Sequence, residues 1–363
     1  MPSLLPRLRL AAFACLLPLS LFAADPRLQE LLKLYPEADT NRDGVLSLEE
    51  AQAHAKIIRK GKSGKTGGDS TSAEDTGAAR NSASKPEPTH ANVSYGPDVR
   101  NKLDLWLAKS GKPTALVVYI HGGGFVNGSK DGASAEMIEG CLAAGVSYMS
   151  INYRYRTTAP IQDILRDCAR SIQFVRAKAK TYNIDPKRIA SYGGSAGAGT
   201  SLWLAFHDDL ADPNNADPVL RESSRIAAAG AINTQGTYNL TRWAEILRKP
   251  EGEFTRPGES AAFYGAKNDE ELETAKYQAI LRDTDMLALV SKDDPPVFLY
   301  TSHPDGAIAN RGALLHHPDH PRAVKKRCDE AGVPATLYFA TIEPTLTGNY
   351  QAKLREFLLA QLK

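Results

Sequence analysis

The pattern of apolar and polar positions changes at about residue 91, and beyond that point short apolar runs alternate with amphipathic stretches. The apolar runs predict buried strands at 115–120, 146–152, 189–192, 226–232, 297–301 and 336–340. The amphipathic stretches predict helices at 161–182, 202–206, 323–331 and 350–362. Strands that alternate with helices predict an α/β fold with a mostly parallel sheet covered by helices on both faces. In such a sheet, ligands bind beyond the carboxyl ends of the strands.

The first 90 residues do not share this pattern. Residues 1–23 resemble a secretory signal peptide, with two arginines, an apolar run and small residues near its end. The run is too short for a stable membrane span, which needs about 20 apolar residues. We therefore expect a secreted or periplasmic protein with no transmembrane segment after signal removal. The expected domains are a signal peptide (1–23), a helical arm (24–60), a flexible linker (61–90) and a large domain (91–363).

The expected linker is defined by its composition. Residues 61–90 are rich in Gly, Ser, Thr, Ala and Lys and contain no large apolar residue. Such a segment buries too little surface to offset the entropy lost on ordering. We expect it to separate the arm from the large domain.

The helical arm contains a stretch, Asp39 to Glu50, that resembles the calcium-binding loop of an EF-hand. Oxygen ligands fall at the positions such a loop uses, and Gly44 stands where the backbone must turn. The expected Ca²⁺ ligands are Asp39, Asn41, Asp43, Val45 through its carbonyl, Ser47 and Glu50. The alternative is an ordinary turn, rich in Asp and Asn, that precedes a helix. EF-hands normally occur in pairs, and no second loop follows here.

Charge and cysteine content exclude some classes of function. The formal charge is +2 over 363 residues with no long run of one sign, so we expect no nucleic-acid binding through a basic surface. Three cysteines, Cys141, Cys168 and Cys328, remain after signal removal, and they lack the C-x-x-C spacing of a zinc site. We expect buried thiols, with one disulfide as the alternative.

A candidate nucleophile follows the strand expected at 189–192. Gly193-Gly-Ser-Ala-Gly197 fits the G-x-S-x-G pattern, in which a sharp turn exposes a serine hydroxyl at the end of a strand. The flanking glycines avoid steric clashes in that turn. The helix after the turn offers free N–H groups to an anion. Because the pattern is short and occurs by chance, its context decides whether Ser195 is a nucleophile.

The context includes a second glycine motif, His121-Gly-Gly-Gly-Phe125, directly after the strand expected at 115–120. Consecutive glycines let backbone N–H groups approach a substrate oxygen, as an oxyanion hole requires. Together with Asn152-Tyr-Arg-Tyr155 and residues 182–189, these motifs resemble the α/β-hydrolase superfamily. Within it, the carboxylesterases that share the lipase-type HGGG motif look most similar, and several of those are secreted carbohydrate esterases.

This resemblance covers roughly residues 93–340 and implies an α/β-hydrolase fold. It implies Ser195 as the nucleophile and the N–H groups of Gly123, Gly124 and Ala196 as the oxyanion hole. We expect His121 to orient the glycine loop and not to act as the base. The family's acid follows the strand at 297–301, which places Asp305 in that role. A solvated turn residue is the alternative for Asp305.

The catalytic histidine is missing from its usual place after the next strand, because no histidine follows His320. A serine hydroxyl needs a neighbouring base to act as a nucleophile. An enlarged loop, 306–321, contains His316, His317 and His320 and leaves the same end of the sheet as Asp305. We expect one of these to be the base and prefer His317 to His316. A metal or surface cluster, and histidines with no base role, remain alternatives.

Two hypotheses about function follow. The first is a secreted serine hydrolase that cleaves carboxylic esters, with acyl esters of carbohydrates as one candidate substrate class. Its chemistry needs no cofactor, and Ca²⁺ would belong to the arm. The second is a catalytically impaired binding protein on the same fold, which the absence of the usual late histidine favours. A peptidase is a weaker third hypothesis, because nothing resembles a propeller domain.

Overall fold

The computed structural model describes residues 28, 32–33, 36–40, 43–47, 50, 85–249, 257–343 and 349–363. The chain divides into two compact units, Met1–Thr71 and Ser72–Lys363. The expected signal peptide (1–23), the linker residues 61–84 and the calcium ligand Asn41 lie outside the described residues. In the first unit, the described part includes a short 3-10 helix, η1 (Pro36–Ala38).

The second unit contains an eight-stranded sheet in the order β1-β2-β4-β3-β5-β6-β7-β8. β1 and β2 are antiparallel to their neighbours, whereas β4, β3, β5, β6, β7 and β8 are mutually parallel. The mostly parallel sheet expected from the sequence is therefore confirmed. The strands are β1 (His90–Ser94), β2 (Lys102–Trp106), β3 (Thr114–Ile120), β4 (Ser147–Ile151), β5 (Ile184–Gly194), β6 (Ala228–Ile232), β7 (Val297–Thr301) and β8 (Ala335–Phe339).

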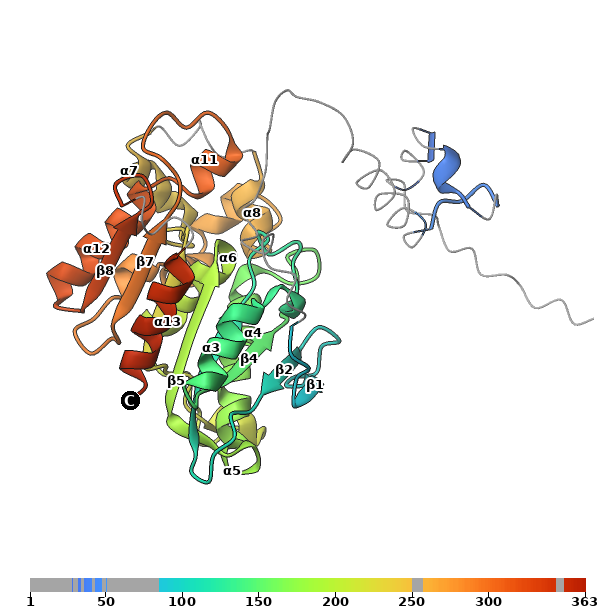
Figure 1. Ribbon diagram of the computed structural model, residues 1–363. Coiled ribbons are helices and arrows are strands. Elements are labelled where there is room, and N and C mark those ends of the chain that lie inside the picture. The colour runs from blue at the N-terminus through green and yellow to red at the C-terminus, as the bar shows by residue number, and fades with distance from the viewer. Residues whose placement is uncertain are drawn as a thin grey trace, which may run out of the picture. The chain divides into compact units, whose positions relative to one another are not determined.

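Helices connect the parallel strands and cover the sheet (Figure 1). The α-helices are α3 (Ala135–Ala143), α4 (Ile161–Ala177), α5 (Ala179–Tyr182), α6 (Ala196–Phe206), α7 (Trp243–Leu247), α8 (Glu259–Tyr264), α9 (Ala275–Asp283), α10 (Met286–Leu289), α11 (Arg311–Leu315), α12 (Asp319–Ala331) and α13 (Tyr350–Gln361). Short 3-10 helices lie between them, namely η3 (Lys130–Gly132), η4 (Pro218–Arg221), η5 (Leu240–Arg242) and η7 (Asp269–Glu273).

The two faces of the sheet form two hydrophobic cores, because successive side chains of a strand point to opposite faces. Leu116, Val118 and Ile120 of β3 belong to the core that includes residues of α4, α6 and α12. Ala115 and Val117 belong to the other core, with residues of α3 and α13. Figure 1 shows α3 and α13 on the same face of the sheet. A continuous apolar run is what a strand buried on both faces requires.

β1 and β2 were not expected from the sequence. The four residues Leu103 to Trp106 of β2 are buried, although Asp104 interrupts the apolar pattern. The Asp104 carboxylate lies 2.7 Å from the Lys130 Nζ atom, and both side chains are buried. A buried charge is tolerated when it is paired and hydrogen-bonded. The partner lies 26 residues away, so the sequence pattern did not reveal it.

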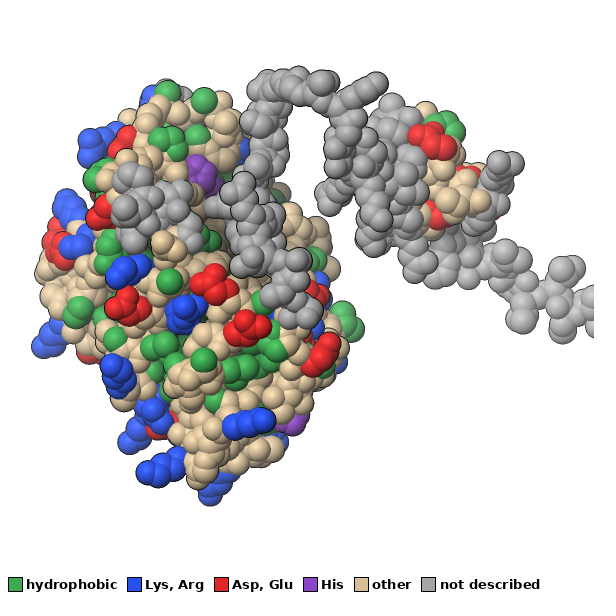
Figure 2. Space-filling view, viewed as in Figure 1, with side chains coloured by type: hydrophobic (Ala, Val, Ile, Leu, Met, Phe, Trp, Pro, Cys, Tyr) green, Lys and Arg blue, Asp and Glu red, His purple; other side chains and the backbone are tan. Residues whose placement is uncertain are grey.

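Three further expectations concern the second unit. Cys141, Cys168 and Cys328 are buried free thiols, which confirms that expectation over a disulfide. Side chains of both charges are interspersed on the face in Figure 2, as the small net charge suggests. In the described part of the chain, no helix combines the length and apolar character needed to cross a membrane.

Candidate active site

Ser195 lies in a tight turn between β5 and α6, at the carboxyl end of the sheet's parallel strands. Its φ of 51° is unusual for a residue with a side chain. A Cβ atom on Gly193 or Gly197 would lie 2.3 or 2.0 Å from the Ile120 carbonyl oxygen. The two glycines therefore let β3 approach the turn closely. This geometry agrees with the nucleophile elbow that the sequence predicts.

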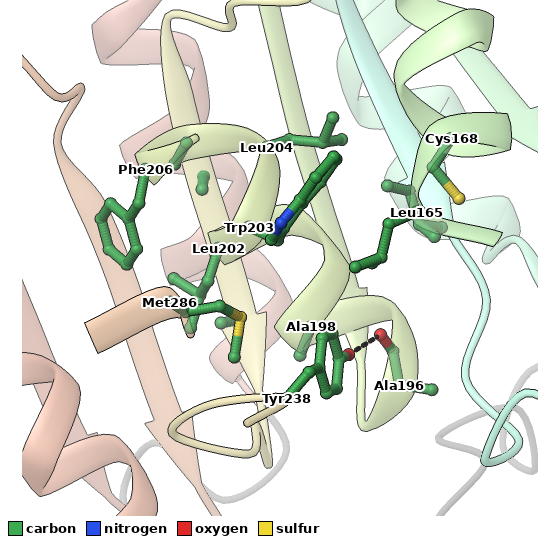
Figure 3. Packing of buried hydrophobic residues seen from close by; sticks show 14 of the residues in the cluster. Leu165, Cys168, Ala196, Ala198, Leu202, Trp203, Leu204, Phe206, Tyr238 and Met286 are labelled. Atoms are coloured by element: carbon green, nitrogen blue, oxygen red, sulfur yellow. Dashed lines mark hydrogen bonds between the residues drawn. The ribbon is translucent and has the colours of Figure 1, made fainter. Parts of the chain in front are cut away.

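The first turn of α6 is held in place by a buried tyrosine. The Tyr238 hydroxyl donates a hydrogen bond of 2.6 Å to the Ala196 carbonyl oxygen (Figure 3). The Ser195 carbonyl oxygen accepts hydrogen bonds from the N–H groups of Ala198 and Gly199. The first N–H groups of a helix, here those of Ala196 and Gly197, have no partner within the helix. They are available to an anion beside Ser195.

The glycine loop 121–125 lies against this turn. A Cβ atom on Gly122 would be 2.7 Å from the Gly194 carbonyl oxygen and 3.5 Å from the Ser195 Cβ atom. Gly123 and Gly124 have φ values of +99° and +59°, a conformation that glycine adopts without strain. The structure thus brings the two glycine motifs together.

His121 supports this loop through contacts with Gly122 and Tyr153. Burial lowers the pKa of His121 to about 4, so the ring is neutral at pH 7. Its Nδ1 atom lies 2.8 Å from the Gly122 carbonyl oxygen, and its ring stacks on that of Tyr153 with centroids 4.1 Å apart. The Tyr153 hydroxyl donates to the His121 carbonyl oxygen at 2.6 Å. These contacts agree with an orienting role for His121.

The base candidate beside Ser195 is His316. The Nε2 atom of His316 lies 2.8 Å from the Ser195 Oγ atom. His316 directly follows α11 and is buried, and its backbone N–H donates to the Gly312 carbonyl oxygen. The Gln235 side chain donates to the Leu315 carbonyl oxygen at 2.9 Å and so fixes the same segment. The enlarged loop therefore brings a histidine to the serine, as expected.

The preference for His317 is corrected by this geometry. His317 Nε2 lies 3.2 Å from the Gly306 carbonyl oxygen, and its Nδ1 accepts the Asp319 N–H. Neighbouring residues near a helix end point in different directions, so only one of the two histidines can face Ser195. His320 is fully buried, bonds the Leu314 carbonyl oxygen and packs against Trp243. It has a structural place in the core.

Asp305 follows β7, as the family resemblance implies for the acid, but its carboxylate pairs with Arg322 and not with His316. Its carboxylate is bound by both terminal nitrogens of Arg322, at 2.5 and 2.7 Å, and its side chain is 55% exposed. Arg322 also donates to Asp319 at 3.1 Å. The planar guanidinium matches a carboxylate with two parallel hydrogen bonds. Asp305 thus fastens its loop to α12, and no hydrogen bond joins it to His316.

A different residue lies against His316. The ring of His303, which follows β7, lies with its centroid 4.8 Å from that of His316. Burial, and secondarily the charge of His303, lower the pKa of His316 to about 4. In the described ranges, no carboxylate forms a hydrogen bond with His316. The neutral imidazole can accept a proton from Ser195, as a general base does. No local sequence pattern indicates that His303 lies beside His316.

Comparisons with known proteins show the family of this chain. The sequence profile of the BD-FAE family matches residues 103–317, more than half of the chain. The chain belongs to the BD-FAE family. The matched BD-FAE region includes the glycine loop, Ser195 and His316.

Curated relatives of this BD-FAE protein include a probable isoprenylcysteine alpha-carbonyl methylesterase of Arabidopsis thaliana, 30% identical over 41% of this chain and 31% of that protein. A probable carboxylic ester hydrolase of Mycobacterium tuberculosis is 31% identical over 43% of this chain and 36% of that protein. The chain therefore spans about a third of the length of the curated relatives it matches.

Solved structures share the α/β-hydrolase fold. A truncated carbohydrate esterase from gut microbiota has a TM-score of 0.58 at 20% identity, covering 75% of this chain and 95% of that one. An acetyl ester-xyloside bifunctional hydrolase from Caldicellulosiruptor lactoaceticus has a TM-score of 0.52 at 22% identity, covering 71% and 87%. The expected fold class is confirmed.

The candidate calcium loop lies in the first unit. Asp39 accepts the Gly44 N–H at 2.9 Å, and Asp43 accepts the Val45 N–H at 2.8 Å. The Glu50 carboxylate accepts hydrogen bonds from the hydroxyls of Thr40 and Ser47. In the part of the chain that the structure describes, no three His, Cys, Asp or Glu side chains are arranged to hold a metal ion. The groups expected to bind the metal present hard oxygen atoms, which suit Ca²⁺.

Proposed function

We propose that this chain is a serine hydrolase that cleaves carboxylic esters. The observation that carries the proposal is the 2.8 Å contact between the Ser195 Oγ atom and the His316 Nε2 atom beside the N-terminus of α6. A buried, neutral imidazole at hydrogen-bond distance is the arrangement that activates a serine hydroxyl. The names of the curated relatives, which include a probable carboxylic ester hydrolase, support the same reaction class.

In the proposed reaction, the Ser195 oxygen attacks the ester carbonyl while His316 takes its proton. His316 then returns the proton to the departing alcohol, and an acyl group remains on Ser195. Water, deprotonated by His316, attacks the acyl enzyme and releases the acid. Each of the two steps passes through an oxyanion. We assign its stabilisation to the N–H groups of Gly123, Gly124 and Ala196.

The finer part of the proposal is that the substrates are acyl esters of carbohydrates. It draws on the names of two structural neighbours, a carbohydrate esterase and an acetyl ester-xyloside bifunctional hydrolase, which share the fold with this chain. A panel of acetylated xylosides and simple alkyl acetates compares the two classes. A higher kcat/KM for every alkyl acetate would contradict the carbohydrate proposal and leave the esterase proposal intact.

The test of the esterase proposal is the hydrolysis of nitrophenyl acetate and longer-chain nitrophenyl esters by wild type and Ser195→Ala. Ser191→Ala is the matched control, because Ser191 is buried on β5 and its hydroxyl has no hydrogen-bond partner among the described residues. We expect turnover that is lost in Ser195→Ala and retained in Ser191→Ala. Absence of serine-dependent turnover across the panel would favour the alternative, a binding protein on a hydrolase fold.

We also propose that the arm binds Ca²⁺ through Asp39, Asn41, Asp43, Val45, Ser47 and Glu50, in a structural or regulatory role. The hard-oxygen donor set supports this proposal. A calcium titration followed by circular dichroism of the full chain tests it, with Glu50→Gln as the variant and Glu37→Gln as the control. We expect a Ca²⁺-dependent change in wild type and Glu37→Gln only. An unchanged wild-type spectrum would contradict it.

Export to the periplasm or the exterior is a separate proposal, supported by the composition of residues 1–23. Mass spectrometry of protein recovered outside the cytoplasm of a bacterial host tests it. We expect a mature N-terminus near residue 24. Retention of the full-length chain in the cytoplasm would contradict the proposal.

A further inference from the structure

Arg156 is a partly buried cation, and no described residue forms a hydrogen bond with its guanidinium. In the described ranges, no carboxylate or carbonyl accepts a hydrogen bond from its guanidinium, and its Nε atom is buried and unsatisfied. Arg154, two residues earlier, shows the usual outcome, because it donates two hydrogen bonds of 2.8 Å to Asp167. Burying a charge without a partner costs free energy. The unpaired, partly buried charge therefore indicates a functional role for Arg156.

The position of Arg156 connects it to the glycine loop. Its backbone N–H donates a 2.7 Å hydrogen bond to the carbonyl oxygen of Phe125, the last residue of that loop. The guanidinium lies over the ring of Phe263 on α8, 5.4 Å from the centroid. Phe125 and Phe263 also contact each other, with centroids 6.4 Å apart. Arg156 is therefore held between the loop beside Ser195 and α8.

Two charged side chains that act on Arg156, those of Glu259 and Arg311, link α8 to the segment that carries the base. Glu259 on α8 forms an ion pair with Arg311, the first residue of α11, and His316 follows the end of α11. Burial lowers the pKa of Arg156, Glu259 opposes this shift, and Arg311 reinforces it. The Glu259 carboxylate already accepts hydrogen bonds from Arg311. The guanidinium of Arg156 is thus left for a ligand.

We propose that Arg156 binds a carboxylate on the ester substrate, so that the preferred substrates are esters with an anionic group close to the scissile bond. This inference rests on the proposed esterase function and names its substrate class. Arginine suits the role, because its planar fork of N–H donors matches a carboxylate and retains its charge when partly buried. Examples of such esters are half-esters of dicarboxylic acids and acylated uronic acids.

The carboxylate can belong to the acyl part or to the alcohol part of the ester, and two matched pairs of probes separate these cases. The first pair is mono-(4-nitrophenyl) glutarate and its methyl ester. The second pair is 4-acetoxybenzoate and its methyl ester. Within each pair, the ratio of kcat/KM for the anionic ester to that for the neutral ester is measured, after subtraction of the uncatalysed rate.

We expect wild type to prefer the anionic ester in at least one pair by about tenfold, the size of effect that a charge-assisted hydrogen bond produces. Arg156→Met should bring this ratio to about one, and Arg156→Lys should retain part of it. Arg166→Met is the matched control, because Arg166 pairs with Asp283 away from the glycine loop, and its ratio should equal that of wild type. Added salt should lower the ratio in wild type.

Two results would overturn the inference. One is a wild type that does not prefer the anionic ester in either pair. The other is a preference that persists in Arg156→Met. If Arg156→Met does not fold, Arg156→Lys and the salt dependence of wild type still decide the question. Failure of the esterase proposal looks different, since wild type would then hydrolyse neither the anionic nor the neutral esters in a Ser195-dependent way.

Discussion

The Oγ atom of Ser195 lies 2.8 Å from the Nε2 atom of His316, a residue 121 positions later in the chain. The serine is presented by the turn between β5 and α6, and the histidine by the end of α11. This contact supplies the proposed nucleophile with a base from a loop that precedes β8 and not from the loop that follows it.

The first prediction separates the two adjacent histidines. His316→Ala should lower kcat/KM for a nitrophenyl ester by about 10²–10⁴, the contribution of a positioned general base. His317→Ala should have a much smaller effect, because its ring contacts Gly306 and Asp319 and not Ser195. Steady-state kinetics on both variants make the comparison. A larger loss in His317→Ala than in His316→Ala would refute this assignment.

The second prediction concerns Asp305. An exposed ion pair contributes about 0–1 kcal/mol, so Asp305→Asn and Arg322→Met should each lower kcat/KM by no more than about fivefold. If Asp305 were the acid of a triad, Asp305→Asn would lower kcat by about 10⁴ and Arg322→Met would not. Measuring both variants with one ester distinguishes the two cases. Equal, small effects are the result that the geometry predicts.

The third prediction is a pH profile. The active form of His316 is the neutral imidazole, and its pKa of about 4 lies below the ordinary histidine value of 6.5. Lowering the pH through 6.5 should therefore leave kcat/KM nearly unchanged, and activity should fall only as the pH approaches 4. His303→Asp would place a carboxylate beside His316 and should move the acid limb to higher pH.

The control for this profile is the folded fraction at each pH. His121 and His320 are also buried with pKa values near 4, so the unfolded chain binds more protons than the folded one between pH 6.5 and 4. Stability should fall over this range as the pH decreases. Circular dichroism at each pH separates this loss from protonation of His316. An acid limb near pH 6.5 in fully folded protein would contradict the prediction.

The fourth prediction tests the close approach of β3 to the turn. Gly197→Ala would place a Cβ atom 2.0 Å from the Ile120 carbonyl oxygen and should destabilise the fold by about 1–3 kcal/mol or more. Gly194→Ala is the matched control, because no described atom beyond its chain neighbours lies within 4 Å of its added Cβ atom. Urea unfolding gives both values. Equal stabilities would show that the packing at Gly197 relaxes without cost.

Most parallel strands could be predicted from the sequence, and β7 has the predicted bounds, because a strand buried on both faces is a continuous apolar run. β2 could not, since Asp104 interrupts its pattern and the compensating Lys130 is distant in sequence. At the site, the glycine motifs identify the turn that holds Ser195 through steric requirements that are local to the chain.

Local sequence patterns could not predict which histidine lies beside Ser195. His316 and His317 are adjacent and chemically identical, and both follow α11, so only the backbone path after this helix decides which one faces the serine. Asp305 follows a strand, as the family resemblance implies for the acid, but Arg322 on α12 binds it. Such contacts depend on tertiary structure.

The segment that carries His316 has a consequence for how such sites are recognised. Every loop that follows a parallel strand lies at the same edge of the sheet. Histidines from different loops can therefore occupy the same position beside the serine. A sequence search that requires a histidine after the last strand would miss chains of this kind. A search for an imidazole beside the serine of a strand-to-helix turn, whatever the order along the chain, finds them.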